Sequence, residues 1–282
     1  MLTKEIMGVL ALAIVWVNTL LIAASAFKDI ASLLHRMASL VPWKAGRKGP
    51  ALIYGRIETG QGTGESIASQ RIEQIGRSSA DPNKKTIIFS DRSFTSTIFG
   101  GVFVPDKDAE RPIQIGPLES GAQVWLPKSQ LQQKAACPSA EQFDHAYEEA
   151  RKAKGHLRTV EARIFAGQHV WIAGDMEAHE NTLKLRPSKT YGLLISKLHP
   201  RRELRRRIAL SLLTIVLIFA AASGVTLLAL SKPYFGTWST VGGGLCLLYF
   251  LLVQPAGTAL RNHIRLPHLA YLRGNWVRET LS

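Results

Sequence analysis

Cysteine is scarce in this sequence, which has only Cys137 and Cys246 among its 282 residues. One lies in a polar segment and the other in an apolar run, so the sequence offers neither a disulfide framework nor a cluster of thiolate ligands for zinc. The eight histidines include no His-Glu-x-x-His motif and no pair at four-residue spacing. His169 and His179 could face each other across a predicted hairpin, but ordinary polar strand and turn positions are the simpler interpretation. We therefore expect no metal site and no cofactor.

Motifs of nucleophilic catalysis and of nucleotide binding are missing as well. No Gly-x-Ser-x-Gly elbow occurs, and the glycine-rich loop at 60–66 lacks the Gly-Lys-Ser/Thr ending of a phosphate-binding loop. Asp106 and Asp108 lie close to Lys107 and Arg111, a pattern typical of a solvated turn rather than of two catalytic acids. The sequence nominates no catalytic residue, and we expect the 60–66 loop to be a hairpin turn.

Long apolar runs, by contrast, are abundant. Residues 6–27 and 208–230 contain no charged residue, and each would be about 33 Å long as a helix, enough to span a hydrocarbon layer of about 30 Å. A third run at 241–260 is of similar length but contains three glycines, Gln254 and Pro255. The sequence therefore predicts three transmembrane helices, of which the last two form a hairpin within 201–260.

The first run, residues 1–27, is expected to be an uncleaved anchor. A cleaved signal peptide needs a basic first segment and a short apolar core. Here Lys4 is offset by Glu5, and the apolar core is long.

Basic residues beside the runs predict the orientation, since Lys and Arg are retained on the cytoplasmic side. The loop at 231–240 contains only Lys232 as a charge, whereas the segments on the other sides of the runs are rich in basic residues. These are Lys28, Arg36, Lys44, Arg47 and Lys48 after the first run, Arg201, Arg202, Arg205, Arg206 and Arg207 before the second, and Arg261, Arg265, Arg273 and Arg278 after the third. We expect a bacterial inner-membrane protein with a periplasmic N-terminus and a cytoplasmic domain and C-terminus.

The net charge of +14 could suggest a nucleic-acid partner. Between Lys28 and Ser196, however, 23 basic residues stand against 18 acidic ones, an ordinary excess for a domain that faces anionic lipid. Most of the charge thus follows from membrane topology, and we expect no nucleic-acid binding.

Residues 50–200 are predicted to form a separate soluble domain. Apolar and polar residues alternate from Ala51 to Glu58, as in a strand with one buried face. Further short strands are expected at 85–89, 93–99, 101–104, 112–115 and 122–126. Such short, closely spaced strands are typical of a small barrel or sandwich. The predicted fold class is a membrane protein with three transmembrane helices and a mainly β, OB-like small barrel of α+β type.

One helix and one meander are expected in the second half of this domain. The helix begins at Pro138 and Ser139, has Gln142 as a capping partner, and leans on the barrel through a thin apolar face. Residues 158–165, 169–176 and 182–185 are predicted to form a three-stranded meander, with a possible last strand at 193–196.

Two segments flank the domain and the spans. Residues 28–49 are expected to form an interfacial helix and a linker, with Trp43 at the membrane interface. Residues 261–282 are expected to form a basic amphipathic tail, since Leu266, Leu269, Leu272 and Trp276 recur at helical spacing.

The densest charge cluster is the run from His199 to Arg207, whose five arginines are Arg201, Arg202, Arg205, Arg206 and Arg207. It is expected to anchor the second span, to gather anionic lipids, and as an alternative to dock a partner. Small residues in the spans, Gly224, Gly242, Gly243 and Gly244, would allow close packing of the hairpin or association with another copy.

The order of these pieces resembles the GIDE family of membrane proteins, whose best-known members are mitochondrial ubiquitin ligases and whose bacterial relatives often lack a ligase module. The matching segments are Ala51 to Glu58, Gly101 to Gly116 and Glu161 to Met176, followed by Leu193 to Ser196. The resemblance implies structural roles for Gly55, Asp106, Gly167, Trp171 and Gly174. Gly174, inside a predicted strand, indicates a bulge or a close backbone approach. The tail lacks the cysteines and histidines of a zinc-bound RING, so ligase activity is not implied.

Without a catalytic constellation, the sequence predicts a membrane-anchored, cytoplasmic-facing binding or scaffold module with a protein partner or a second copy of itself. It would act alone or as a subunit of a membrane complex. The alternative is a ligase-like or hydrolytic membrane enzyme. An enzyme would gather polar groups of shifted acidity in a pocket, whereas a scaffold would present an exposed apolar or charged groove.

Overall fold

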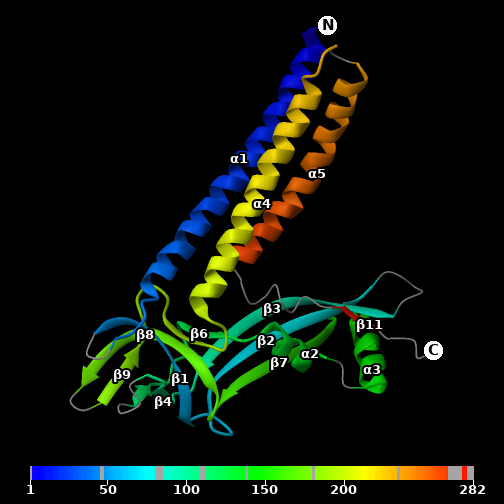
Figure 1. Ribbon diagram of the computed structural model, residues 1–282. Coiled ribbons are helices and arrows are strands. Elements are labelled where there is room, and N and C mark those ends of the chain that lie inside the picture. The colour runs from blue at the N-terminus through cyan, green and yellow to red at the C-terminus, as the bar shows by residue number, and fades with distance from the viewer. Residues whose placement is uncertain are drawn as a thin grey trace. The chain divides into compact units, whose positions relative to one another are not determined.

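The computed structural model describes residues 2–44, 48–79, 85–107, 112–136, 139–179, 182–233, 236–265 and 275–277 (Figure 1). The elements in these ranges are α1 (Leu2–Ser39), β1 (Gly49–Gly60), β2 (Ser66–Ser78), β3 (Thr86–Ile98), β4 (Gly101–Pro105), β5 (Ile113–Ile115), β6 (Ala122–Trp125), α2 (Lys128–Ala135), α3 (Ala140–Ala150), β7 (His156–Phe165), β8 (His169–His179), β9 (Thr182–Arg186), β10 (Leu193–Ser196), α4 (Pro200–Ala229), α5 (Thr237–Arg265) and β11 (Asn275–Val277). The chain divides into a helical unit, residues 1–37 with 202–267, and a β-rich unit, residues 38–201 with 268–282.

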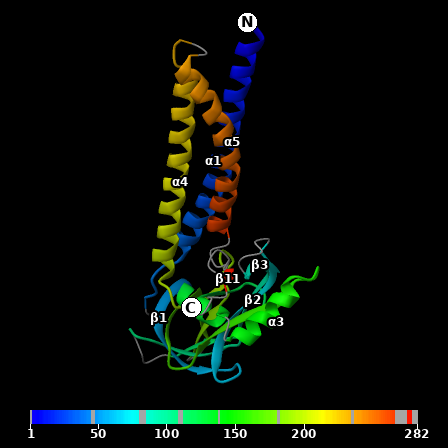
Figure 2. The ribbon, with the colours of Figure 1, turned by 90° about the vertical axis from the view of Figure 1, so that its right-hand side faces the viewer.

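The helical unit is a bundle of α1, α4 and α5 (Figure 2). Buried residues from all three helices form its centre: Val15, Ile218, Ala222, Cys246, Tyr249 and Val253. Trp16 of α1 donates a hydrogen bond from Nε1 to Thr226 Oγ1 of α4 at 3.0 Å, and the hydroxyls of Thr19 and Tyr249 join α1 to α5 at 2.6 Å. The bundle is therefore held by packing and by side-chain hydrogen bonds between helices.

The outer faces of these helices are apolar too, with exposed leucines, valines and isoleucines on each. Helices that are hydrophobic all round belong in a large core or in a membrane. By length and composition, Gly8–Ser39, Pro200–Ala229 and Thr237–Leu260 can each cross a membrane. The prediction of three such helices is confirmed in these terms.

The helix boundaries differ from the predicted ones. α1 runs without interruption from Leu2 to Ser39, so residues 28–39 extend the first apolar helix and do not form a separate one. The basic run lies inside α4, whose first residue is Pro200. Pro255 is accommodated within α5, which continues to Arg265.

In the β-rich unit, five strands close into a barrel. Around the ring, β1 pairs with β4, β4 with β5, β5 with β9, β9 with β8, and β8 again with β1. The β5–β9 pair is parallel and the other four are antiparallel. Beyond the ring, β10 pairs with β8, and β6 pairs in parallel with β10. The predicted barrel is thus confirmed.

The barrel interior is filled by alternate residues of its strands, as the two-residue period of a strand requires. Ile53, Phe103, Ile113, Ile172 and Leu185 are buried there, one from each strand. β1 pairs with both β4 and β8 at Gly55, where a Cβ would overlap the carbonyl oxygen of Val104. Only glycine lets the two neighbours approach β1 at this position.

A second sheet, in the order β11-β3-β2-β7, lies beside the barrel. Two sequence predictions are corrected in this sheet. The 60–66 loop is a turn between β1 and β2, but these strands belong to different sheets and do not form a hairpin. The two strands expected at 85–89 and 93–99 are one strand, β3. β2 was not predicted. Its inward positions include Gln70 and Gln74, both fully buried, so the apolar alternation that marks a strand is missing.

Gln74 is held by a polar network that explains its burial. Its Nε2 donates to Asp91 Oδ1 at 2.6 Å, and its Oε1 accepts from Arg158 Nε at 2.7 Å. The Arg158 guanidinium also donates to the carbonyl of Ala135 and lies 3.4 Å from the centre of the Phe89 ring. A buried amide is tolerated when both ends of it are hydrogen-bonded, as here.

The predicted helix is α3. The Ser139 hydroxyl accepts a hydrogen bond from the Gln142 backbone N–H, as its capping position requires. Phe143, Ala146 and Ala150 are buried against Ile87 and Phe89 of β3 in a cluster separate from the barrel core. α2, which is rich in glutamine and lysine, was not predicted.

The predicted meander is only half correct. β8 and β9 do form a hairpin, but β7 pairs with β2 and belongs to the second sheet. Gly167, at φ +80°, turns the chain between the sheets, and its N–H donates to the Ile57 carbonyl at 2.8 Å. The turn is thus fixed to β1 instead of closing a β7–β8 hairpin.

Two flanking predictions are also corrected. Trp43 packs against the barrel core, and its backbone N–H donates to the Leu52 carbonyl. Trp276, expected on a helix, lies in β11, where it pairs with Ile87 of β3. Leu266, Leu269 and Leu272 lie outside the described residues.

We predict that Gly55→Ala weakens the barrel. A methyl group there overlaps backbone of β4, and over-packing of this kind costs about 1–3 kcal/mol. Gly116→Ala is the matched control, because a Cβ at Gly116 meets no atom within 4 Å. Denaturant unfolding of the full chain in detergent, followed by near-ultraviolet circular dichroism, should give a lower midpoint for Gly55→Ala alone. Equal midpoints for both variants would contradict the role assigned to Gly55.

Candidate functional site on the barrel

Four rings lie next to one another on the outside of the barrel. Tyr54 of β1 is in register with Trp171 of β8, and their ring centroids are 4.8 Å apart. The Trp171 ring lies 4.3 Å from that of His199, and the Tyr54 ring lies 5.9 Å from that of His169. We call this row, in the order His169, Tyr54, Trp171 and His199, the aromatic ladder.

Strand alternation places three of these rings on the outer face. Val170 and Ile172, beside His169 and Trp171 on β8, are fully buried, so the side chains of His169 and Trp171 point the other way. Tyr54 lies between the buried Ile53 and the tightly packed Gly55, and its side chain is 40% exposed. The same pairing that closes the barrel therefore aligns the rings.

The fourth ring is positioned by the turn after β10. Ser196 is in register with Trp171. Its hydroxyl donates to the Leu198 carbonyl at 2.6 Å and accepts from the Leu198 N–H at 3.0 Å. This local bonding, typical of serine at turns, turns the chain so that His199 stacks on Trp171.

One end of the ladder carries a carboxylate. The Asp106 backbone N–H donates to the Tyr54 carbonyl at 3.1 Å, and Asp106 Oδ1 lies 3.7 Å from His169 Nε2. Both side chains are about half exposed, at 43% and 50%. At the other end, His199 immediately precedes α4 and its basic run. The ladder thus has a carboxylate at one end and a histidine at the other.

Exposed aromatic side chains are well suited to binding a protein partner. Tyrosine and tryptophan supply large contact areas at low conformational cost and are enriched at interaction hot spots. Trp171 is half-buried between two rings and is therefore held in one orientation. The arrangement can dock a partner through apolar and π contacts.

Three of the five residues for which the family resemblance implies structural roles come together here. Gly55, Asp106 and Trp171 lie in or beside the ladder, whereas Gly167 lies in the turn between the sheets. Sequence reasoning did not connect Tyr54, His169 and His199 with them. A signal was available in the sequence, because Tyr54 and Trp171 are aromatic residues at outward-facing positions of two predicted strands.

Gly174 is the fifth of these residues, and it allows a close approach on β8. A Cβ there would lie 2.5 Å from the carbonyl oxygen of Arg186. The Tyr191 hydroxyl donates to the Gly174 carbonyl at 3.3 Å. Burial of Tyr191, together with the charge of Asp175, raises its pKa from 10 to about 12. Gly174 is thus the close backbone approach that the sequence suggested.

We predict a late-titrating tyrosine at this position. Because the folded state favours neutral Tyr191, its contribution to stability is complete below pH 10 and is lost as the pH rises through 10 towards 12. An alkaline absorbance titration of the wild type minus that of Tyr191→Phe isolates this group. Its midpoint should be near 12, and a midpoint near 10 would contradict the assignment.

A cleft of about 410 Å³ lies over β4, β5 and β9. Its lining residues are Gln61, Gly101, Val102, Gln114, Ile115, Gly116, Pro117, Leu118, Lys184, Leu185, Arg186, Pro187 and Leu193. Arg186 is paired with Glu177 at 2.9 Å. This lining contains amide and basic side chains but no carboxylate, histidine, cysteine or hydroxyl.

The five arginines of the basic run do not form one equivalent set. Arg207 is only 2% exposed, and its Nε and Nη2 donate to Glu203 Oε1 at 3.1 and 2.9 Å, one turn earlier in α4. Arg202, Arg205 and Arg206 are exposed, and Arg201 is intermediate. Arg207 is therefore buried and paired within α4, unlike the exposed arginines of the run.

The four glycines predicted to pack the spans are also not equivalent. Gly242 lies against the backbone of α4, where a Cβ would overlap the Ala229 nitrogen. Around Gly224, Gly243 and Gly244, no atom lies within 4 Å of a Cβ position. Only Gly242 packs the hairpin.

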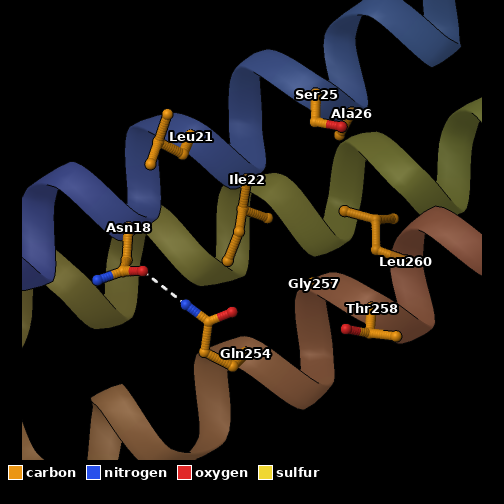
Figure 3. A pocket seen from close by; sticks show the side chains of 9 residues that line it. All are labelled: Asn18, Leu21, Ile22, Ser25, Ala26, Gln254, Gly257, Thr258 and Leu260. Atoms are coloured by element: carbon orange, nitrogen blue, oxygen red, sulfur yellow. Dashed lines mark hydrogen bonds between the residues drawn. The ribbon is translucent and has the colours of Figure 1, made fainter.

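Sequence analysis did not single out the polar contacts between α1 and α5. Gln254 Nε2 donates to Asn18 Oδ1 at 2.6 Å, beside a cavity of about 240 Å³ (Figure 3). Ser25 and Thr258 also line this cavity. The signal was available, since amide residues inside apolar runs are costly in a membrane and mark contacts or function.

Among the described residues, no three His, Cys, Asp or Glu side chains are grouped as metal ligands. His169 and His179 are the first and last residues of one strand, β8, and so do not lie on the two strands of a hairpin.

Comparison with known proteins gives no relative. No protein-family model, curated protein or solved structure matches the chain significantly.

Proposed function

We propose that the chain is a membrane-anchored binding module. Its three apolar helices cross a membrane, and its barrel binds a protein partner on the cytoplasmic side, as a scaffold or as a subunit of a membrane complex. The aromatic ladder carries this proposal. It is an ordered row of rings, 4.3 to 5.9 Å apart, with Tyr54 and His169 open to solvent.

The alternative, a ligase-like or hydrolytic enzyme, has less support. The lining of the cleft over β4, β5 and β9 contains the amine of Lys184 but no carboxylate, histidine, hydroxyl or thiol to act beside it. An enzyme of either kind needs such groups close together. A binding role needs no such catalytic groups in the cleft or the aromatic ladder.

The barrel topology fits a binding module. Numbered along the chain, the barrel strands β1, β4, β5, β8 and β9 follow the ring order first, second, third, fifth, fourth. This order resembles that of OB-type barrels, which bind ligands through surface strands and loops. Membership of the GIDE-type family without a RING is part of the same proposal, supported by the meeting of Gly55, Asp106 and Trp171 at one place.

Anionic lipid is the second partner in this proposal. Arg202, Arg205 and Arg206 are exposed on the first turns of α4, immediately before its apolar stretch. Basic residues in this position attract anionic headgroups and are retained in the cytoplasm. The proposed location is a bacterial inner membrane, with the N-terminus in the periplasm.

The test is a pull-down of the tagged full-length chain in nanodiscs, read by quantitative mass spectrometry. We expect a stoichiometric protein partner with the wild type and its loss with Tyr54→Ala/Trp171→Ala, because hot-spot aromatic residues contribute about 2 kcal/mol or more each. The control is Leu157→Ala/Phe165→Ala, which alters two exposed apolar residues of β7 in the other sheet.

One further arm makes this test decisive. Arg202, Arg205 and Arg206 changed to Gln should reduce bound anionic lipid but retain the protein partner, and Arg207 is left intact because it is paired with Glu203. Equal recovery of every partner with the ladder variant and the control variant would refute the ladder as the docking surface.

A further inference from the structure

The polar groove between α1 and α5 is left with hydrogen-bonding capacity that a membrane cannot satisfy. This argument rests on the proposed membrane crossing of the three helices. Asn18 lies near the middle of the apolar run at 6–27, and Gln254 lies within the run at 241–260. Lipid tails offer no hydrogen bonds, so an amide exposed to them is destabilising.

Three threonine hydroxyls in the bundle are satisfied within the chain, whereas the buried hydroxyl of Ser211 has no partner among the described residues. Thr19, Thr214 and Thr226 each donate to the carbonyl one turn earlier. In contrast, the hydroxyls of Ser25 and Thr258 make no hydrogen bond within the described residues. Figure 3 shows both side chains at the groove.

Gln254 is only half satisfied. One N–H of its amide donates to Asn18 Oδ1, and Asn18 Nδ2 donates to the Ile14 carbonyl. The Gln254 Oε1 and its second N–H have no partner among the described residues, and the side chain is exposed. A donor and an acceptor therefore remain on one amide at the outer surface of the bundle.

This amide belongs to a continuous exposed face of α5. Gly243, Leu247, Leu251, Gln254 and Thr258 recur at spacings of three to four residues, which places them on one side of the helix, and we call them the Gln254 stripe. Leu247 and Leu251 are 70% and 67% exposed, and Gly243 has no atom within 4 Å of its Cβ position. The stripe thus combines a small residue, two apolar residues and two polar groups.

We propose that the Gln254 stripe is the docking surface for a second copy of this chain. Two copies inserted in the same direction place their α5 helices parallel about a twofold axis along the membrane normal. Each residue near the axis then faces the same residue of the second copy. Gly243 meets Gly243 and lets the backbones approach, and Gln254 meets Gln254 further along the helix.

Hydrogen-bond complementarity selects a second copy as the occupant. Across the twofold axis, the free N–H of each Gln254 donates to the Oε1 of the other, which satisfies both amides with two reciprocal bonds. The contacts of Gln254 with Asn18 remain intact within each chain.

Disulfide cross-linking in native membranes tests this arrangement. In a background with Cys137→Ser and Cys246→Ser, Leu247→Cys should give a covalent dimer on mild oxidation. Leu217→Cys, 59% exposed on α4, is the control and should not. Equal cross-linking of the two variants would overturn the proposal.

A matched glycine pair separates docking from folding. Gly243 and Gly224 both have open space around their Cβ positions, so a leucine at either should leave the single chain intact. Gly243→Leu should abolish the Leu247→Cys cross-link, whereas Gly224→Leu should retain it. Retention of the full cross-link in Gly243→Leu would overturn the stripe as the interface.

The contribution of the amide is measured by energy transfer between labelled chains in vesicles at varied protein-to-lipid ratio. Gln254→Leu should weaken association about 3- to 30-fold, the range for hydrogen bonds between membrane helices. Unchanged association would overturn the role of Gln254.

The outcomes for the stripe and for the proposed function can be told apart. All samples are membrane pellets washed with alkaline carbonate. A chain absent from the pellet would overturn both membrane anchoring and the stripe. A chain present in the pellet but not cross-linked would overturn only the stripe, because the ladder pull-down does not depend on dimer formation.

Discussion

The pairing of β1 with both β4 and β8 is the constraint on which the β-rich unit depends. At Gly55, β1 pairs with Pro105 of β4 and with Val170 of β8, and no side chain fits between them. This double pairing closes the ring of five strands and encloses its apolar interior. It also determines the outer surface, because Tyr54 and Trp171 are in register only when the ring is closed. Fold and candidate site thus depend on the same backbone contact.

Local signals in the sequence were sufficient for much of the architecture. Apolar runs predicted the three long helices, the Ser139 cap predicted α3, and alternation of apolar and polar residues predicted β1. Pairing partners were not predictable in the same way. β7 was assigned to a meander because Gly167 follows it closely, but Gly167 bonds to Ile57, a residue more than one hundred positions earlier. β2 was missed because its buried positions include Gln70 and Gln74, and the burial of Gln74 depends on hydrogen bonds with the distant Asp91 and Arg158.

The candidate site was predicted in pieces for a related reason. Asp106 and Trp171 were assigned roles one at a time, while the ladder arises from β1, β8 and the turn after β10. His169 was interpreted as an ordinary polar strand position, and its aromatic neighbours emerged from strand register. The arginine run was treated as uniform because sequence cannot show that Arg207 lies one turn from Glu203 and is buried with it. Composition predicted the chemistry of these segments, and contacts between distant residues determined which side chains can use it.

The pairing of β11 with β3 bears on membrane topology through simple parity. β3 precedes α4 in the chain and β11 follows α5, yet both belong to one sheet. A chain that leaves this sheet and returns to it must cross a membrane an even number of times in between. Two crossings by α4 and α5 meet the condition, and a single crossing does not. The pairing of β11 with β3 therefore requires that α5, despite its glycines, crosses the membrane whenever α4 does.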